Sequence, residues 1–207
     1  MPEQLSKVAP NAGVMIGNAG DRPLSRHPDL AILAMEALAS WSNVEAFMLS
    51  LFVELFGGHG ALAAEVFLSM QTQFAKSAAI DTAAANVLKE RPEELRLLRA
   101  ILAIARTSEK ARNKLAHWTW GESPEVPDAL LLVDPRCTKD RLDRSDIYVY
   151  KDRDFQSIIR ANDRLCGFGL AFKFILMGHV ANDEGRLLNE LIAEPEIQER
   201  LQHQPQG

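Results

Sequence analysis

A long amphipathic helix, predicted over residues 92–121, is the feature that most constrains how this chain can fold. Pro92, Glu93 and Glu94 form a favourable first turn, with two acids at the positive end of the helix dipole. Gly121 supplies the stop signal. One face is apolar at a spacing of 3.6 residues, at Leu97, Leu98, Ile101, Ile104, Ala105, Ala111 and Leu115. A helix with such a face must be buried against other elements.

The opposite face of this helix is polar and basic, at Arg99, Arg106, Lys110, Asn113, Lys114 and His117. Asn113 and His117 are four positions apart and lie one above the other, whereas Arg112 points back toward the apolar side. Residues 96–114 carry six basic side chains and one acid, a net +5 in a chain of net −5. A basic stripe on an acidic body favours a local phosphate contact over nonspecific coating of nucleic acid. The simpler alternative is a solvated helix face.

The rest of the chain is also expected to be mainly helical, as one domain over residues 29–202. Residues 1–28, rich in Gly, Pro, Asn and Ala, are expected to be a flexible arm, and residues 203–207 a flexible tail. Two short apolar runs, 129–134 and 146–150, predict a β-hairpin before the fourth helix. The helices besides 92–121 are expected at about 29–56, 61–90, 154–181 and 184–202.

Glu45 falls on the inward stripe of the first predicted helix, between Trp41 and Met48. An inward carboxylate is costly unless it is paired, and the inward-leaning Arg112 is the expected partner. A structural ion pair between two helices and a catalytic carboxylate are both open for Glu45.

The pattern Arg112-Asn113-x-x-x-His117 resembles the Arg-x(4–6)-His signature of HEPN domains, in which an asparagine commonly follows the arginine. The resemblance implies an all-α, HEPN-like bundle of four to five helices with the small β-hairpin as an insertion. Many HEPN domains are metal-independent endoribonucleases that act as dimers. By this resemblance His117 is the acid and base, Arg112 binds the phosphate, Asn113 holds geometry or substrate, and Glu45 matches a polar position facing the motif.

Metal-independent RNA cleavage needs a group that exchanges protons near neutral pH and donors matched to phosphate oxygens, which His and Arg provide. Arg112 and His117 are five positions apart, roughly 140° around an ideal helix, so they do not converge by themselves. Either the helix is distorted near its end, or Arg112 reaches around it, or each residue serves a site that a second chain completes. The expected RNA contacts are Arg99, Arg106, Lys110, Lys114 and Trp118.

The expected partners are RNA, a second copy of the chain, and an antitoxin or regulatory protein in a toxin–antitoxin or phage-defence setting. In HEPN toxins silenced by a nucleotidyltransferase, a tyrosine follows the histidine by two residues, and here that position is Thr119. Silencing of that kind is therefore not expected. The alternative from another class is a catalytically silent HEPN-type bundle that binds RNA or protein. A ligand-binding bundle and a metal-dependent hydrolase rank lower, because the sequence has no other convergent polar cluster.

Two cysteines, Cys137 and Cys166, form no disulfide framework, and neither a metal nor a cofactor is expected. No secretory signal is evident, and the apolar runs 46–56 and 165–177 are too short to span a bilayer. A soluble, cytoplasmic protein is expected.

Overall fold

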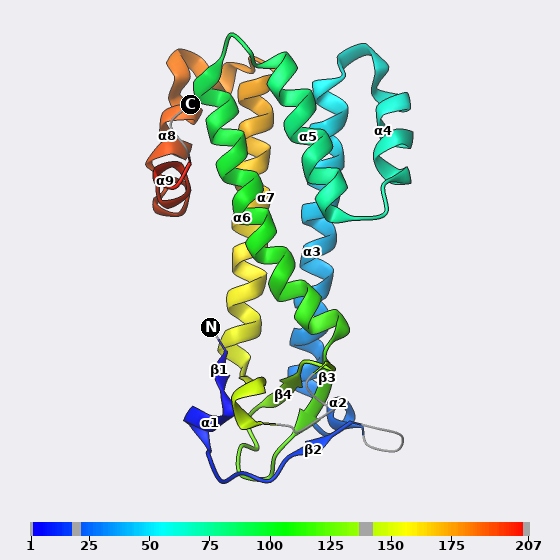
Figure 1. The fold of residues 1–207 in the computed structure, drawn as a ribbon. Helices are drawn as coiled ribbons and strands as arrows, with labels where there is room; N and C mark the ends of the chain where they lie inside the picture. Colours follow the sequence, from blue (N-terminus) through cyan, green and yellow to red (C-terminus); the bar gives the residue numbers. More distant parts are fainter. Residues whose placement is uncertain (1, 18–21, 137–142, 205–207) are drawn as a thin grey trace. The chain divides into compact units, whose positions relative to one another are not determined.

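The computed structural model describes residues 2–17, 22–136 and 143–204. The chain is mostly helical and carries a small antiparallel sheet (Figure 1). It divides into two compact units. Unit 1 comprises residues 1–41 and 108–161, and unit 2 comprises residues 42–107 and 162–207. Three helices contribute residues to both units: α3 (Pro28–Leu55), α6 (Pro92–His117) and α7 (Asp152–Leu176).

Unit 1 is built on a five-stranded sheet with the order β1-β5-β4-β3-β2, in which all paired strands are antiparallel. The strands are β1 (Glu3–Gln4), β2 (Met15–Ile16), β3 (Thr119–Glu122), β4 (Leu130–Val133) and β5 (Ile147–Tyr150). The predicted hairpin is confirmed as β4 and β5, which pair with Leu131 opposite Val149. It is the centre of a larger sheet, because β3 adds to one side of it and β1 to the other.

Both faces of this sheet are covered, which explains why all four residues of β4 are buried. Leu131 and Val133 point to one face and pack against Leu5 of α1 (Leu5–Val8). Leu130 and Leu132 point to the other face, where they join Leu115 of α6 and helices α3 and α7. The alternation follows the two-residue period of a strand. The fully buried Tyr150 and Phe155 pack at 5.5 Å between ring centroids in this second cluster.

The N-terminal segment is the main difference from the sequence-based expectation. Residues 2–17 were expected to be a flexible arm, but they supply both edge strands of the sheet and a buried leucine, Leu5. Arg144 adds a long-range tie, because its guanidinium donates to the backbone oxygen of Ala12 (2.9 Å). Residues 18–21 of the expected arm and residues 205–207 of the expected tail lie outside the described residues, as does Cys137.

Unit 2 is helical. Besides parts of α3, α6 and α7 it contains α4 (Gly60–Ser69), α5 (Gln73–Val87), α8 (Arg186–Ala193) and α9 (Pro195–Gln202). Two 3-10 segments precede α4 and α8, η1 (Gly57–His59) and η4 (Val180–Gly185). The largest fully buried side chains of this unit are Met48, Leu51, Phe67, Ile80, Leu88, Leu97, Leu98, Ile101 and Phe172, and all of them except Leu88 lie in helices α3 to α7.

Two of the predicted helices are broken in the structure. The helix expected over 61–90 stops at Met70 and restarts after Thr72, whose hydroxyl caps α5 by accepting from the N–H of Ala75 (3.1 Å). The helix expected over 184–202 is divided at Glu194, because Pro195 opens α9. The helix expected to reach Gly121 ends at His117, since the following residues join the sheet.

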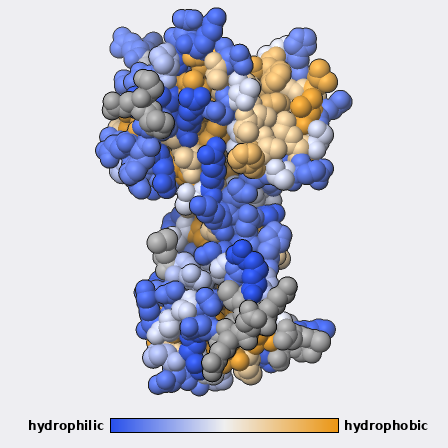
Figure 2. Space-filling model, viewed as in Figure 1, coloured by the Kyte–Doolittle hydropathy of each residue, from blue (hydrophilic) through white to orange (hydrophobic). Residues whose placement is uncertain are grey.

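Apolar side chains are exposed on unit 2 around α4 and the start of α5, where the space-filling view shows a continuous apolar area (Figure 2). Leu62, Leu68 and Phe74 are the most exposed of them, with Phe74 at 78%. No helix in the described part of the chain combines the length and apolar character that a bilayer crossing needs.

Candidate functional site

The Arg112-Asn113-x-x-x-His117 motif occupies the last turns of α6, within unit 1. Leu115 is buried in the apolar cluster on the face of the sheet that is covered by α3, α6 and α7, and this burial fixes the rotation of α6 about its axis. That rotation leaves Arg112 and Asn113 half-buried and His117 exposed. The motif histidine is therefore open to solvent at a helix end.

Arg112 and Asn113 are joined directly. The Nη1 of Arg112 donates to the Oδ1 of Asn113 over 3.0 Å. A guanidinium has five N–H donors in a planar fork, so this contact orients the arginine and leaves donors for an anion. Among the described residues no hydrogen bond to the His117 side chain is found, and its imidazole can serve a ligand.

Lys114, expected to contact RNA, lies against two aromatic rings of unit 1. Its Nζ is 4.4 Å from the ring centroid of Tyr148 and 4.8 Å from that of Trp118. The two rings are themselves in contact, with centroids 5.6 Å apart. Burial lowers the pKa of Lys114, and the charge of Asp134 acts in the opposite direction. The ammonium thus stabilises an aromatic cluster through cation–π contact. This is a structural role, different from the expected contact of Lys114 with an RNA phosphate.

Asp134 follows β4 and contributes a buried carboxylate near this cluster. Arg136 binds it at both oxygens, at 3.0 Å from Nε to Oδ1 and 2.6 Å from Nη2 to Oδ2. The hydrogen bonds from the Arg136 side chain and backbone lower the pKa of Asp134. The carboxylate is therefore held ionised and offsets part of the local positive charge.

Glu45 has a partner other than the expected Arg112. Its carboxylate lies 3.8 Å from the Nζ of Lys76 on α5, within unit 2, and its side chain is 38% exposed. Glu45 is therefore part of a half-exposed ion pair between α3 and α5, while Arg112 is bound to Asn113. Such a pair contributes little to stability.

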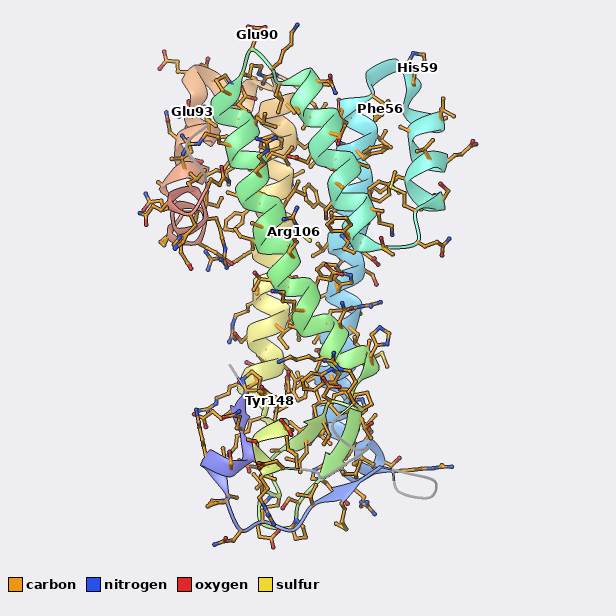
Figure 3. The ribbon with its side chains drawn as sticks, in the orientation of Figure 1. Phe56, His59, Glu90, Glu93, Arg106 and Tyr148 are labelled. Carbon is orange, nitrogen blue, oxygen red and sulfur yellow. The ribbon has the colours of Figure 1, made fainter. Side chains whose placement is uncertain are left out.

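The other predicted RNA contacts differ in how accessible they are. Arg106, in unit 2, and Lys110, in unit 1, are exposed on α6, and Figure 3 labels Arg106. Arg99, in unit 2, is bound to Asp81 of α5, with 2.7 Å between Nε and Oδ1. Trp118 is half-buried on the helix-covered face of the sheet, beside the labelled Tyr148.

A buried charge cluster in unit 1 escaped the sequence reasoning. Glu122, at the end of β3, is buried and forms an ion pair with Arg26, and its other carboxylate oxygen lies 3.3 Å from the Nε2 of His27. These two basic residues lie at the end of the short helix α2 (Pro23–Arg26) and just after it. These contacts attach α2 to β3. The alternation of Trp118, Trp120 and Glu122 is the sequence signal for this strand, because i, i+2 and i+4 share one face.

The described residues contain no group of three or more His, Cys, Asp or Glu side chains arranged to bind a metal ion. Comparison of the chain with family models, with curated proteins and with solved structures gives no match. The site must therefore be interpreted from its own residues.

Proposed function

We propose that this protein is a HEPN-like, metal-independent endoribonuclease that acts as a dimer, with His117 and Arg112 as its reacting and phosphate-binding residues. The observation that carries the proposal is the exposed His117 at the end of α6, on the same helix end as an Arg112 oriented by Asn113. The exposed Lys110, also in unit 1, adds positive charge on the same helix. Glu45, paired with Lys76, has no catalytic part in this proposal.

The chemistry assigns one role to each side chain. A neutral imidazole removes the proton of a ribose 2′-hydroxyl, and the 2′-oxygen attacks the adjacent phosphorus. The guanidinium of Arg112 binds the phosphate oxygens, on which negative charge grows. A protonated imidazole gives its proton to the departing 5′-oxygen, so the products are a 2′,3′-cyclic phosphate and a free 5′-hydroxyl.

Two histidines are needed for this reaction to proceed in one step, one as base and one as acid. Each chain has one motif histidine, and Arg112 and His117 are separated by roughly 140° around α6. A two-fold dimer that brings two α6 ends together supplies both histidines and both arginines. A toxin–antitoxin or phage-defence role, with a regulatory protein as partner, is part of the same proposal.

The test is cleavage of a mixed single-stranded RNA in EDTA by the wild type, His117→Ala, Arg112→Ala and the control His59→Ala. His59 is an exposed histidine in η1 of unit 2 (Figure 3), and its removal should leave cleavage unchanged. The two motif variants should lose at least about 100-fold in rate, the usual contribution of a positioned acid or base. Mapping of the new ends should find cyclic phosphates.

Mixing the two inactive variants tests the composite site. Heterodimers of His117→Ala with Arg112→Ala contain a single motif histidine, so they should stay as inactive as either homodimer, and recovered activity would refute the need for two histidines. A strict monomer by light scattering at micromolar concentration would refute the dimeric mechanism. Absence of cleavage by all proteins would favour the alternative, a catalytically silent HEPN-type module that binds RNA or protein.

A further inference from the structure

A pocket of about 430 Å³ lies within unit 1, between α2 and the start of β3. Its walls include the side chains of Arg22, Leu24, Ser25, Trp118 and Trp120. The volume is at the lower end of the range of small-molecule pockets. It suits one flat ring system with a short polar attachment.

The rings of the two tryptophans that line this pocket pack against other side chains. Trp118 packs on Tyr148 at 5.6 Å, and the Nζ of Lys114 lies 4.8 Å from its ring centroid. Trp120 packs on Phe155 with 6.4 Å between ring centroids. Because these contacts hold the rings in place, a ligand would lose little free energy in ordering the walls.

The opposite wall is also anchored. Glu122 binds Arg26 and His27, the residues that end α2 and follow it. The short helix is thereby attached to β3, which contains Trp120 and directly follows Trp118. The pocket is a formed feature of unit 1.

The polar groups at this pocket indicate the charge of its ligand. Arg22 is exposed, and no ion pair to its guanidinium is found within the described ranges. Ser25, also exposed, adds a hydroxyl. Indole faces together with an available guanidinium match an aromatic base attached to a phosphate.

We infer that this pocket binds one unpaired nucleotide of single-stranded RNA, with the base stacked on Trp118 and Trp120 and its phosphate at Arg22. Trp118 follows His117 directly in the chain, so the pocket and the motif both lie at the C-terminal end of α6. This inference rests on the proposed function. It adds that cleavage requires an unstacked base beside the reacting bond.

The test measures quenching of tryptophan fluorescence by a mixed-sequence RNA hexanucleotide whose riboses are 2′-O-methylated, which blocks attack by the 2′-oxygen. The single strand should bind, and a duplex of the same sequence should bind at least about tenfold more weakly, because its bases are not free to stack. AMP and UMP should compete with the single strand. Equal binding of duplex and single strand, or binding of the mononucleotides without the hexanucleotide, would overturn the inference.

Variants assign the binding to the pocket. Trp118→Leu should weaken binding by about 5- to 150-fold, which is the contribution of one stacked base. Arg22→Ala should reduce the slope of log affinity against log salt by about 0.7, the value for one phosphate contact on a single strand. Arg153→Ala, at an exposed arginine of unit 1 outside the pocket, is the matched control and should leave the slope unchanged. Identical salt slopes for Arg22→Ala and Arg153→Ala would refute the phosphate contact even where Trp118→Leu fails to fold.

The two proposals fail in different ways. Binding that depends on Arg22 without cleavage by the wild type would refute the nuclease and retain the pocket. Cleavage that depends on His117, with binding indifferent to Arg22 and Trp118, would refute the pocket and retain the nuclease.

Discussion

Gly169 of α7 provides the sharpest test of the packing in unit 2. A Cβ at this position would overlap the ring of Phe47, with even the Cε1 atom only 2.5 Å away. Ordinary carbon contacts lie at about 3.5–4.0 Å, so Gly169→Ala must displace the ring or the helix by roughly 1 Å or more. Overpacking of this kind costs about 1–3 kcal/mol, and because the Phe47 ring is half-exposed and can turn aside in part, the lower end of this range is expected. Two residues earlier, Gly167 has open space around its own Cβ position.

The matched pair separates helix propensity from packing. Gly167→Ala should stabilise the protein by about 0.5–1 kcal/mol, because alanine loses less conformational freedom than glycine in a helix. Gly169→Ala has the same gain and the packing cost, and should therefore be less stable than Gly167→Ala by about 1–3 kcal/mol. For a chain of this size this is roughly 2–12 °C in Tm, measured by thermal unfolding followed by circular dichroism.

A double-mutant cycle tests the cause. With Phe47→Ala the ring is absent, so a further Gly169→Ala should be neutral or stabilising by about 0.5–1 kcal/mol. The coupling energy should equal the packing cost. If Gly169→Ala is as stable as Gly167→Ala, or if its cost persists in the Phe47→Ala background, the reasoning from this contact is refuted.

Three further predictions concern unit 1. Glu122→Gln should lower the free energy of unfolding in urea by about 1–2 kcal/mol, because the charged hydrogen bonds to Arg26 are lost; an unchanged value would contradict the role of this pair. Gly121→Ala should destabilise the protein by at least about 1 kcal/mol, since a Cβ would lie 2.8 Å from the backbone oxygen of Met15 on β2; wild-type stability would show that the two strands can separate at no cost. Burial raises the pKa of the Tyr150 hydroxyl above that in the unfolded chain, so the stability that the neutral side chain contributes is fully present below about pH 10 and is lost as the pH rises further. Tyr150→Phe lacks this ionisation and should unfold at a higher pH in an alkaline titration. Equal unfolding midpoints for the wild type and the variant would refute this.

The elements that could be predicted from the sequence are those whose pattern is local. The helices α3 and α6 and the strands β4 and β5 each have a regular apolar period or a clear stop signal, and they begin and end close to the expected residues. The strands β1 and β2 contain two residues each, which is too short for any period to be visible. Their pairing is decided by distant strands, so the local composition, rich in Gly and Pro, predicts a flexible arm instead.

Only part of the candidate site could be predicted from the sequence, and again it was the part that depends on local pattern. The exposure of His117 follows from its position opposite Leu115 on the wheel of α6. Glu45 was placed inward because one inward direction was assumed along all of α3, but that helix contributes to two units and Glu45 faces Lys76. The pocket behind Trp118 could not be predicted, since it depends on α2, whose attachment through Glu122 is a long-range contact.

The edge strands of the sheet also have a consequence for the order of folding. The amide of Gln4 bonds the backbone of Ser145, 141 positions along the chain, and Arg144 reaches Ala12 over 132 positions. Loop closure over such lengths is entropically costly and slows the formation of a native sheet. During synthesis β1 must wait for β5, and β2 for β3, before either strand has a partner. The apolar side chains of residues 2–17 therefore remain uncovered until more than a hundred later residues have been made, and this segment is then vulnerable to aggregation.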